Sequence, residues 1–204
     1  MSKNKISKNW INKQKRDIYV RKSLVEGYRS RAAYKLKEID EKFKIIKNGI
    51  YLIDLGAAPG SWSQFVNKKT KNSKILAIDI LKIKKIENIK NLEGDFTDYK
   101  TQEQIKEYFN SKVDVILSDM AANTTGNKNI DSIKTGELCK EAIFFAKDIL
   151  KKDGKLVVKF FIGSVFNEIV KIAKQFFKEV NIYKPKASRK ESKESYLICK
   201  YLRI

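Results

Sequence analysis

The segment at 52–65, LIDLGAAPGSWSQF, constrains the fold of this chain more than any other. An apolar run of strand length is followed by a turn with two glycines, Gly56 and Gly60, and then by a helical pattern of apolar residues. Glycine lets the backbone come close to a ligand because it has no Cβ atom. In α/β proteins, such strand–turn–helix units hold ligands beyond the carboxyl end of the strand. The segment therefore predicts an α/β fold with a ligand site at this turn.

The same alternation continues along the chain. Short apolar runs rich in β-branched residues occupy 49–56, 74–80, 113–119 and 154–161. Helical patterns separate or follow them, at 61–69, 101–110, 133–151 and 165–177. Strands that alternate with helices form parallel sheets covered on both faces. The last apolar segments, 179–185 and 195–202, have no helix between them and predict an antiparallel pair. We therefore expect a Rossmann-like α/β sheet of about seven strands, mostly parallel, with an antiparallel edge strand.

Positive charge is concentrated at the start of the chain. The 204 residues carry a formal net charge of +20, and positions 1–37 hold twelve basic residues and two acidic ones. A concentrated basic segment indicates a polyanionic partner. Nucleic acid fits better than an anionic membrane surface, because no helix there has a strongly apolar face. We expect a basic arm at 1–25 followed by a single domain at 26–204.

Two classes of ligand compete for the glycine turn. A dinucleotide site needs G-x-G-x-x-G, whereas this turn reads G-A-A-P-G and places Pro59 where a backbone N–H would contact a phosphate. S-adenosylmethionine, which has no phosphate, fits better. Asp79, at the end of the second strand, is placed to bind ribose hydroxyls, and Asp95 is placed to accept from an adenine amino group. Gly60 and Trp62 complete the expected cofactor site, although Trp62 is also an ordinary core residue and Asp95 an ordinary helix cap.

Five sequence motifs resemble those of the FtsJ (RrmJ, RlmE) family of ribosomal RNA 2′-O-methyltransferases. They are, in chain order, DLGAAPGSWSQ, GDF, SDMAAN, VVKFF and KPKASRKESKESY, and the resemblance runs from about Gly27 to the C-terminus. It implies a class I methyltransferase fold, S-adenosyl-L-methionine as cofactor and methyl transfer to a ribose 2′-hydroxyl. It also implies that the substrate is a uridine of large-subunit (23S-type) rRNA, so the expected partner is the large ribosomal subunit.

The residues themselves favour a hydroxyl as the methyl acceptor. The chain has no histidine to act as a base near neutral pH. The motif SDMAAN also lacks the Asn/Asp-Pro-Pro-aromatic pattern of amino-directed methyltransferases. Base-carbon methylation often needs a cysteine nucleophile, but Cys139 and Cys199 lie in apolar patterns and are expected in the core.

Lys159 is the unusual residue of the strand LVVKFF. A lysine within an apolar strand is costly unless its ammonium is paired or neutralised. Near Lys35, like charge and burial would lower the pKa of Lys159 towards the neutral amine that a base requires. Asp119, at the end of the fourth strand, is expected to orient Lys159 and to lie near the methionine part of the cofactor, with Glu194 orienting Lys159 from the other side. The resemblance implies that these four residues form the catalytic tetrad, although Lys35 and Glu194 taken singly are ordinary surface charges.

Arg29, Arg31 and the segment 184–190 are expected to flank this site and to bind RNA phosphates. Two other functions stay open: an RNA-binding ribosome-assembly factor without catalysis, and a small nicotinamide-dependent reductase. Within the family, transfer RNA and messenger RNA caps are alternative substrates. We expect a monomeric, metal-independent enzyme of the cytoplasm without membrane attachment, and the basic N-terminus leaves a mitochondrial location open.

Overall fold

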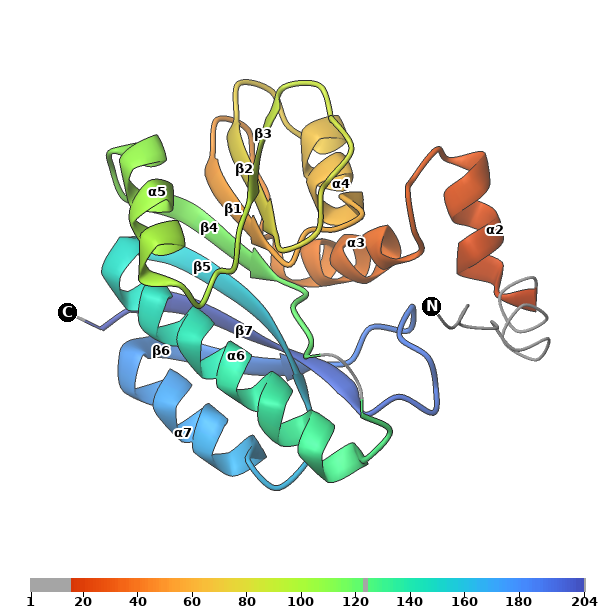
Figure 1. Ribbon diagram of the computed structural model, residues 1–204, viewed down its shortest axis with the longest axis vertical. Helices are drawn as coiled ribbons and strands as arrows, with labels where there is room; N and C mark the ends of the chain where they lie inside the picture. Colours follow the sequence, from red (N-terminus) through yellow and green to blue (C-terminus); the bar gives the residue numbers. More distant parts are fainter. Residues whose placement is uncertain (1–15, 123–124, 204) are drawn as a thin grey trace, which may run out of the picture.

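The apolar runs form strands because parallel strands buried on both faces need nearly continuous apolar sequence. In the computed structural model, which describes residues 16–122 and 125–203, seven strands form one sheet (Figure 1). The strands are β1 (Tyr51–Leu55), β2 (Lys74–Asp79), β3 (Ile89–Glu93), β4 (Val113–Ser118), β5 (Leu150–Phe161), β6 (Phe177–Tyr183) and β7 (Glu194–Leu202). Their order across the sheet is β3-β2-β1-β4-β5-β7-β6. The predicted mostly parallel sheet is confirmed.

Strand directions place the polar residues of interest at the carboxyl ends of the parallel strands. β1 lies between β2 and β4 and is parallel to both. β7 is antiparallel to its neighbours β5 and β6. The expected antiparallel pair is therefore present, and the strand order adds that β7 lies inside the sheet while β6 forms the edge. Because β1, β2 and β4 are parallel, their carboxyl ends meet, and Asp79 and Asp119 lie there.

Helices cover both faces of the sheet. They are α2 (Ile18–Val25), α3 (Ala32–Phe43), α4 (Ser61–Lys69), α5 (Tyr99–Phe109), α6 (Lys128–Ile149) and α7 (Phe166–Phe176). α3 and α4 pack on one face, and α5, α6 and α7 on the other (Figure 1). Successive residues of β1 alternate between the two faces: Leu52 packs in the core under α3 and α4, and Ile53 in the core under the other helices. The next residue, Asp54, therefore faces α4.

The start of α6 is set by a local cap and not by apolar periodicity. α6 begins at Lys128 instead of at 133, because Asn127 accepts two N–H groups of the first turn at 3.0 and 3.4 Å. The difference arises from side-chain hydrogen bonds that the spacing of apolar residues does not report.

α2 stands beside the sheet rather than on it (Figure 1). Its contact with α3 includes the rings of Tyr19 and Tyr34, whose centroids lie 5.5 Å apart. Of the predicted arm at 1–25, positions 1–15 lie outside the described residues. Among the helices that the structure describes, none is long and apolar enough to cross a lipid bilayer.

Candidate active site

The turn after β1 is closed tightly against its neighbours. Gly56 has a φ of 70°, and a Cβ atom there would lie 2.6 Å from Cγ and 2.9 Å from Cα of Met120. Gly60 has a φ of 105°, and a Cβ atom there would lie 2.7 Å from Ile86 and 2.9 Å from the guanidinium of Arg29. Both positions therefore require glycine, for backbone conformation and for space.

A cavity of about 530 Å³ opens beside this turn. The three carboxylates expected at the cofactor, Asp79, Asp95 and Asp119, line the cavity together with Gly56 and Ala58. The remaining wall is largely apolar and includes Leu81, Phe96, Met120 and Leu138. A mostly apolar cavity with a few convergent polar groups is typical of a small-molecule site.

Asp79 joins the two loops that border the cavity. Its Oδ2 accepts the backbone N–H of Ala58 at 2.9 Å, and its Oδ1 accepts the backbone N–H of Leu81 at 2.8 Å. Ala58 belongs to the turn after β1, and Leu81 to the loop after β2. Each carboxylate oxygen can accept a second hydrogen bond, so Asp79 keeps acceptor capacity for a ligand.

Asp95 stabilises a turn rather than a helix end. Its Oδ1 accepts the backbone N–H of Thr97 at 2.8 Å and the hydroxyl of Thr97 at 2.7 Å. α5 begins later, at Tyr99, and its N-cap is Asp98. The helix-cap alternative for Asp95 is therefore wrong, and the residue lies on the wall of the cavity.

Gly60 and Trp62 lie at the start of α4, next to the turn. Gly60 is the N-cap of the helix. Trp62 is 2% exposed, its indole N–H donates to the carbonyl of Ala32 at 2.8 Å, and its ring lies 5.7 Å from the ring of Tyr196. The structure therefore places the side chain of Trp62 in the core, apart from the residues that line the cavity. Its backbone N–H lies in the first turn of α4, where helix N–H groups have no partner within the helix.

We expect Gly60→Ala to weaken binding of the adenosyl ligand predicted for this cavity, with S-adenosylhomocysteine as the probe, by about tenfold or more. The new methyl group displaces Ile86 and Arg29, and the left-handed backbone costs about 1–2 kcal/mol for a residue with a Cβ atom. Isothermal titration calorimetry measures the affinity. The matched control is Gly49→Ala, with a φ of 71° but nothing within 4 Å of the added atom. Equal losses of affinity in both variants would show that backbone strain, and not the crowded turn, is responsible.

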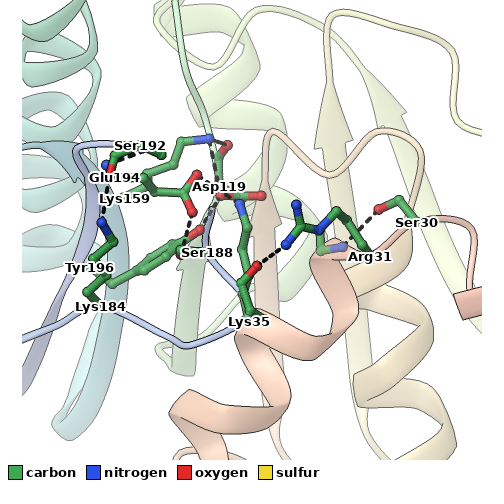
Figure 2. A network of polar contacts seen from close by, with 12 residues as sticks. Ser30, Arg31, Lys35, Asp119, Lys159, Lys184, Ser188, Ser192, Glu194 and Tyr196 are labelled. Atoms are coloured by element: carbon green, nitrogen blue, oxygen red, sulfur yellow. Dashed lines mark hydrogen bonds and ion pairs between the residues drawn. The ribbon is translucent and has the colours of Figure 1, made fainter. Parts of the chain in front are cut away.

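The four charged residues of the predicted tetrad meet beside the cavity (Figure 2). Nζ of Lys159 lies 3.1 Å from Oδ1 of Asp119, and the same ammonium donates to the backbone carbonyl of Asp119. Nζ of Lys35 lies 2.8 Å from Oε2 of Glu194. Lys159 is 7% exposed and Glu194 is 9% exposed, so neither is an ordinary surface charge. The structure brings all four together, but it pairs Glu194 with Lys35 and not, as expected, with Lys159.

Asp119 is the acceptor at the centre of this network. Burial alone would raise the pKa of Asp119, but the charges of Lys159 and Lys35 and a hydrogen bond from Tyr196 outweigh it, so the pKa lies below its ordinary value. The hydroxyl of Tyr196 donates to Oδ1 of Asp119 at 2.7 Å. Burial and the neighbouring carboxylates raise the pKa of Tyr196 well above its usual range, which keeps the phenol as a donor. Asp119 is therefore an ionised carboxylate held between two cations and a phenol.

Sequence reasoning missed three residues of the site. Tyr196 binds Asp119, and the hydroxyl of Ser188 donates to Oε1 of Glu194 at 2.7 Å. Lys134, on α6, is a basic residue on the wall of the cavity. A tyrosine in a strand and a serine in a loop have no periodic signal, because their role depends on which distant segment they face.

Arg29 and Arg31 do not present free guanidinium groups to RNA. Arg29 donates to three backbone carbonyls of the protein. Arg31 forms an ion pair with Asp17 at 2.7 Å and donates to the carbonyl of Ala187. The prediction that these two side chains bind phosphates stays a prediction, because no RNA is present and a guanidinium has five N–H donors. The segment 184–190 does flank the site, because Ser188 contacts Glu194.

Asp54 is a buried carboxyl beneath the site. Its Oδ2 accepts the hydroxyl of Ser63 at 2.7 Å, and its Oδ1 has no hydrogen-bond partner among the described residues. Burial raises the pKa of Asp54 to about 7, and the charges of Asp119 and Asp79 act in the same direction, against the hydrogen bonds from Ser63. The folded protein therefore holds this carboxyl protonated at mildly acidic pH.

We expect Asp54→Asn to remove a pH dependence of stability. A carboxyl whose pKa rises from 3.8 to about 7 on folding stabilises the fold below pH 4, and this contribution is lost as the pH rises towards 7. Between pH 4 and pH 7 the wild type should lose up to about 4 kcal/mol of unfolding free energy relative to the variant. Above pH 7 the difference between the two proteins should stay constant. Urea denaturation across this range measures the difference. Parallel curves for the two proteins would contradict the expectation.

The sequence matches the family model described as FtsJ-like methyltransferase over residues 28–202. A curated relative, "Ribosomal RNA large subunit methyltransferase E" of Pelagibacter ubique (strain HTCC1062), is 63% identical over 203 residues, which cover 100% of both chains. The matched region therefore spans the whole fold.

Solved structures share the fold. A Plasmodium falciparum chain assigned as a ribosomal RNA methyltransferase has a TM-score of 0.78 and 34% identity, over 86% of this chain and 98% of the other. Aeropyrum pernix fibrillarin, which was crystallised with natively bound S-adenosyl-L-methionine, has a TM-score of 0.59 and 14% identity, over 84% of this chain and 75% of the other. The second likeness shows the fold alone, which is the Rossmann-like methyltransferase fold.

Proposed function

Because this chain belongs to the FtsJ-like methyltransferase family, we propose that it transfers a methyl group from S-adenosyl-L-methionine to a ribose 2′-hydroxyl of RNA. One observation carries the proposal: two ion pairs, Lys159 with Asp119 and Lys35 with Glu194, meet next to a cavity that Asp119 lines. A hydroxyl acceptor needs a proton acceptor, and a buried lysine supplies one in a chain without histidine.

The residues of the cavity fit an adenosyl cofactor. Asp79 and Asp95 offer carboxylate oxygens to ribose hydroxyls and to an adenine amino group, between apolar walls. Gly60 and the first-turn N–H groups of α4, including that of Trp62, suit the carboxylate of the methionine part. The carboxylate of Asp119 suits the positive charge of the methionine part of the cofactor. When bound, the cofactor supplies an electrophilic methyl group.

We assign the chemical step to Lys159. The ammonium of Lys159 first releases a proton to solvent, and the resulting neutral amine accepts the proton of the 2′-hydroxyl at Nζ. Asp119 holds this nitrogen from its side chain and from its backbone carbonyl, and Tyr196 fixes Asp119. Lys35 and Glu194 form the neighbouring pair that completes the proposed tetrad. The remaining contribution is the alignment of acceptor oxygen and methyl group, which converts a bimolecular reaction into a positioned one.

We propose large-subunit ribosomal RNA, and within it a uridine, as the substrate. The support is the similarity to a large-subunit rRNA methyltransferase over the whole chain. The net charge of +20 fits a partner of this kind. We further propose a basic arm at 1–25, a catalytic domain at 26–204, a monomeric state and action in the cytoplasm without membrane attachment or a metal ion.

A methyl-transfer assay with labelled S-adenosylmethionine tests the proposal. The substrates, offered in parallel, are undermethylated large ribosomal subunits, free rRNA and tRNA. Label should appear on the ribose of a uridine in large-subunit rRNA. Label on tRNA would change the proposed substrate and leave the proposed reaction unchanged. Cofactor binding without transfer to any RNA would favour the alternative function, an RNA-binding assembly factor, over the proposed enzyme.

A further inference from the structure

The guanidinium of Arg29 bridges two loops that are far apart in sequence. Its Nη1 donates to the carbonyl of Pro59 at 2.8 Å and to the carbonyl of Lys84 at 2.7 Å. Its Nη2 donates to the carbonyl of Lys85 at 2.8 Å. Pro59 lies in the turn after β1, and Lys84 and Lys85 lie in the loop after β2. One planar cation therefore holds both loops through charge-assisted hydrogen bonds.

These two loops form one side of the cavity. Ala58, from the first loop, and Leu81, from the second, line it, whereas Arg29 does not. Asp79 joins the same loops from within, because it accepts the N–H groups of Ala58 and Leu81. Two side chains therefore connect the loops. Asp79, which lines the cavity, accepts two N–H groups, and Arg29, which does not line it, donates to three carbonyls.

The backbone of Arg29 is anchored independently of its side chain. Its N–H donates to Oε1 of Gln64 on α4 at 2.8 Å. Lys68, also on α4, donates to the carbonyl of Glu26 at 2.8 Å. The segment before α3 therefore stays on α4 when the guanidinium is changed, and a substitution at 29 removes the bridge between the loops alone.

We propose that Arg29 is a positioning residue that sets the spacing of the two loops that hold the cofactor. This inference rests on the proposed function. Its physical basis is the rigid fork of the guanidinium, which fixes several carbonyls at once, whereas the single ammonium of lysine lacks this geometry. Arg31, two residues later, binds Asp17 and Ala187 instead and lies on the side of the segment 184–190. The two arginines therefore have separate expected effects.

The test compares Arg29→Lys and Arg29→Gln with Arg31→Lys. Isothermal titration calorimetry gives the affinity for S-adenosylmethionine and S-adenosylhomocysteine, well below the melting temperature of each variant. We expect both Arg29 variants to bind the cofactor about 10- to 100-fold more weakly, because charge-assisted hydrogen bonds to the loops are lost. Arg31→Lys should change cofactor affinity by less than about threefold, since its contacts lie elsewhere.

Steady-state kinetics separate positioning from general damage. In the Arg29 variants the KM for S-adenosylmethionine should rise, while kcat at saturating cofactor and the KM for RNA stay within about threefold of the wild type. The salt dependence of RNA binding should not change, because three backbone carbonyls engage the guanidinium of Arg29. Arg29→Lys keeps the positive charge, so a role in binding phosphates would leave that variant close to the wild type.

Three results would overturn the inference. The first is wild-type cofactor affinity in Arg29→Lys and Arg29→Gln. The second is an equal loss of cofactor affinity in Arg31→Lys. The third is a loss of RNA affinity in the Arg29 variants with cofactor affinity unchanged. The wild type is the separate test of the proposed function: if it binds neither adenosyl compound, the proposed function fails first and the inference with it.

Discussion

Lys159→Ala should reduce methyl transfer by a factor of about 10² to 10⁴, the usual contribution of a positioned general base. Lys159 is buried, and its ammonium is held by two oxygens of Asp119, so no other amine replaces it at that point. Cofactor affinity should fall much less than kcat, because Lys159 is proposed to act on the hydroxyl and not on the cofactor. Single-turnover transfer of labelled methyl groups to large-subunit rRNA measures the chemical step.

Lys155→Ala is the matched control for this variant. Lys155 lies on the same strand, but its ammonium donates to the carbonyl of Lys44 at 2.6 Å, away from the tetrad. Its loss should leave the rate of transfer within about threefold of the wild type, since it shares no partner with the tetrad. If Lys159→Ala transfers methyl groups as fast as Lys155→Ala, another residue must be the base.

Asp119→Asn should cost about 3–5 kcal/mol of stability, the range for removing one partner of a buried ion pair. The carboxylate is 18% exposed and lies 3.1 Å from the ammonium of Lys159, and its lowered pKa shows that the charge is favoured. The amide can still accept from Tyr196, but it leaves Lys159 without its carboxylate. We expect transfer to fall by at least about a hundredfold, because the base is no longer held. Urea denaturation and the transfer assay give the two effects.

An aspartate within β4, the strand that precedes Asp119, provides the comparison. Asp114 accepts the N–H of Tyr51 at 2.8 Å and pairs with Lys151 at 2.8 Å, but Lys151 is 44% exposed. Water replaces the carboxylate for an exposed cation, so Asp114→Asn should cost about 1 kcal/mol or less. Equal losses of stability in the two variants would mean that burial of the pair at Asp119 is unimportant.

Local rules explain which parts of this protein were predictable. The alternation of apolar runs gave the sheet and its helices, because burial on both faces of a parallel strand dictates composition residue by residue. The turn at 56–60 also follows from local sterics, since positive φ angles and close backbone contacts admit only glycine. The start of α6 was misplaced because its cap, Asn127, acts through a side-chain hydrogen bond and not through periodicity.

Family motifs identified the members of the site but not their pairing. Lys35 and Glu194 are 159 positions apart and form an ion pair, whereas the sequence suggested that Glu194 faces Lys159. The same limit applies to Tyr196, which was unremarkable in sequence and donates to Asp119. In the register of β5 against β7, Lys159 lies opposite Tyr196 and Glu194 lies opposite Phe161, and a strand carries no mark of the residue opposite it.

The sequence by itself determined the sheet and the glycine turn, because these depend on periodicity and on the sterics of neighbouring residues. Its motifs also named the four charged residues of the site. The tertiary structure alone decided that the side chain of Trp62 belongs to the core, and that the guanidinium groups of Arg29 and Arg31 bind the protein's own carbonyls. The physical reason is distance along the chain. A buried donor takes whichever acceptor the fold places within hydrogen-bond reach, and that acceptor lies 30 residues away for Trp62 and 156 residues away for Arg31.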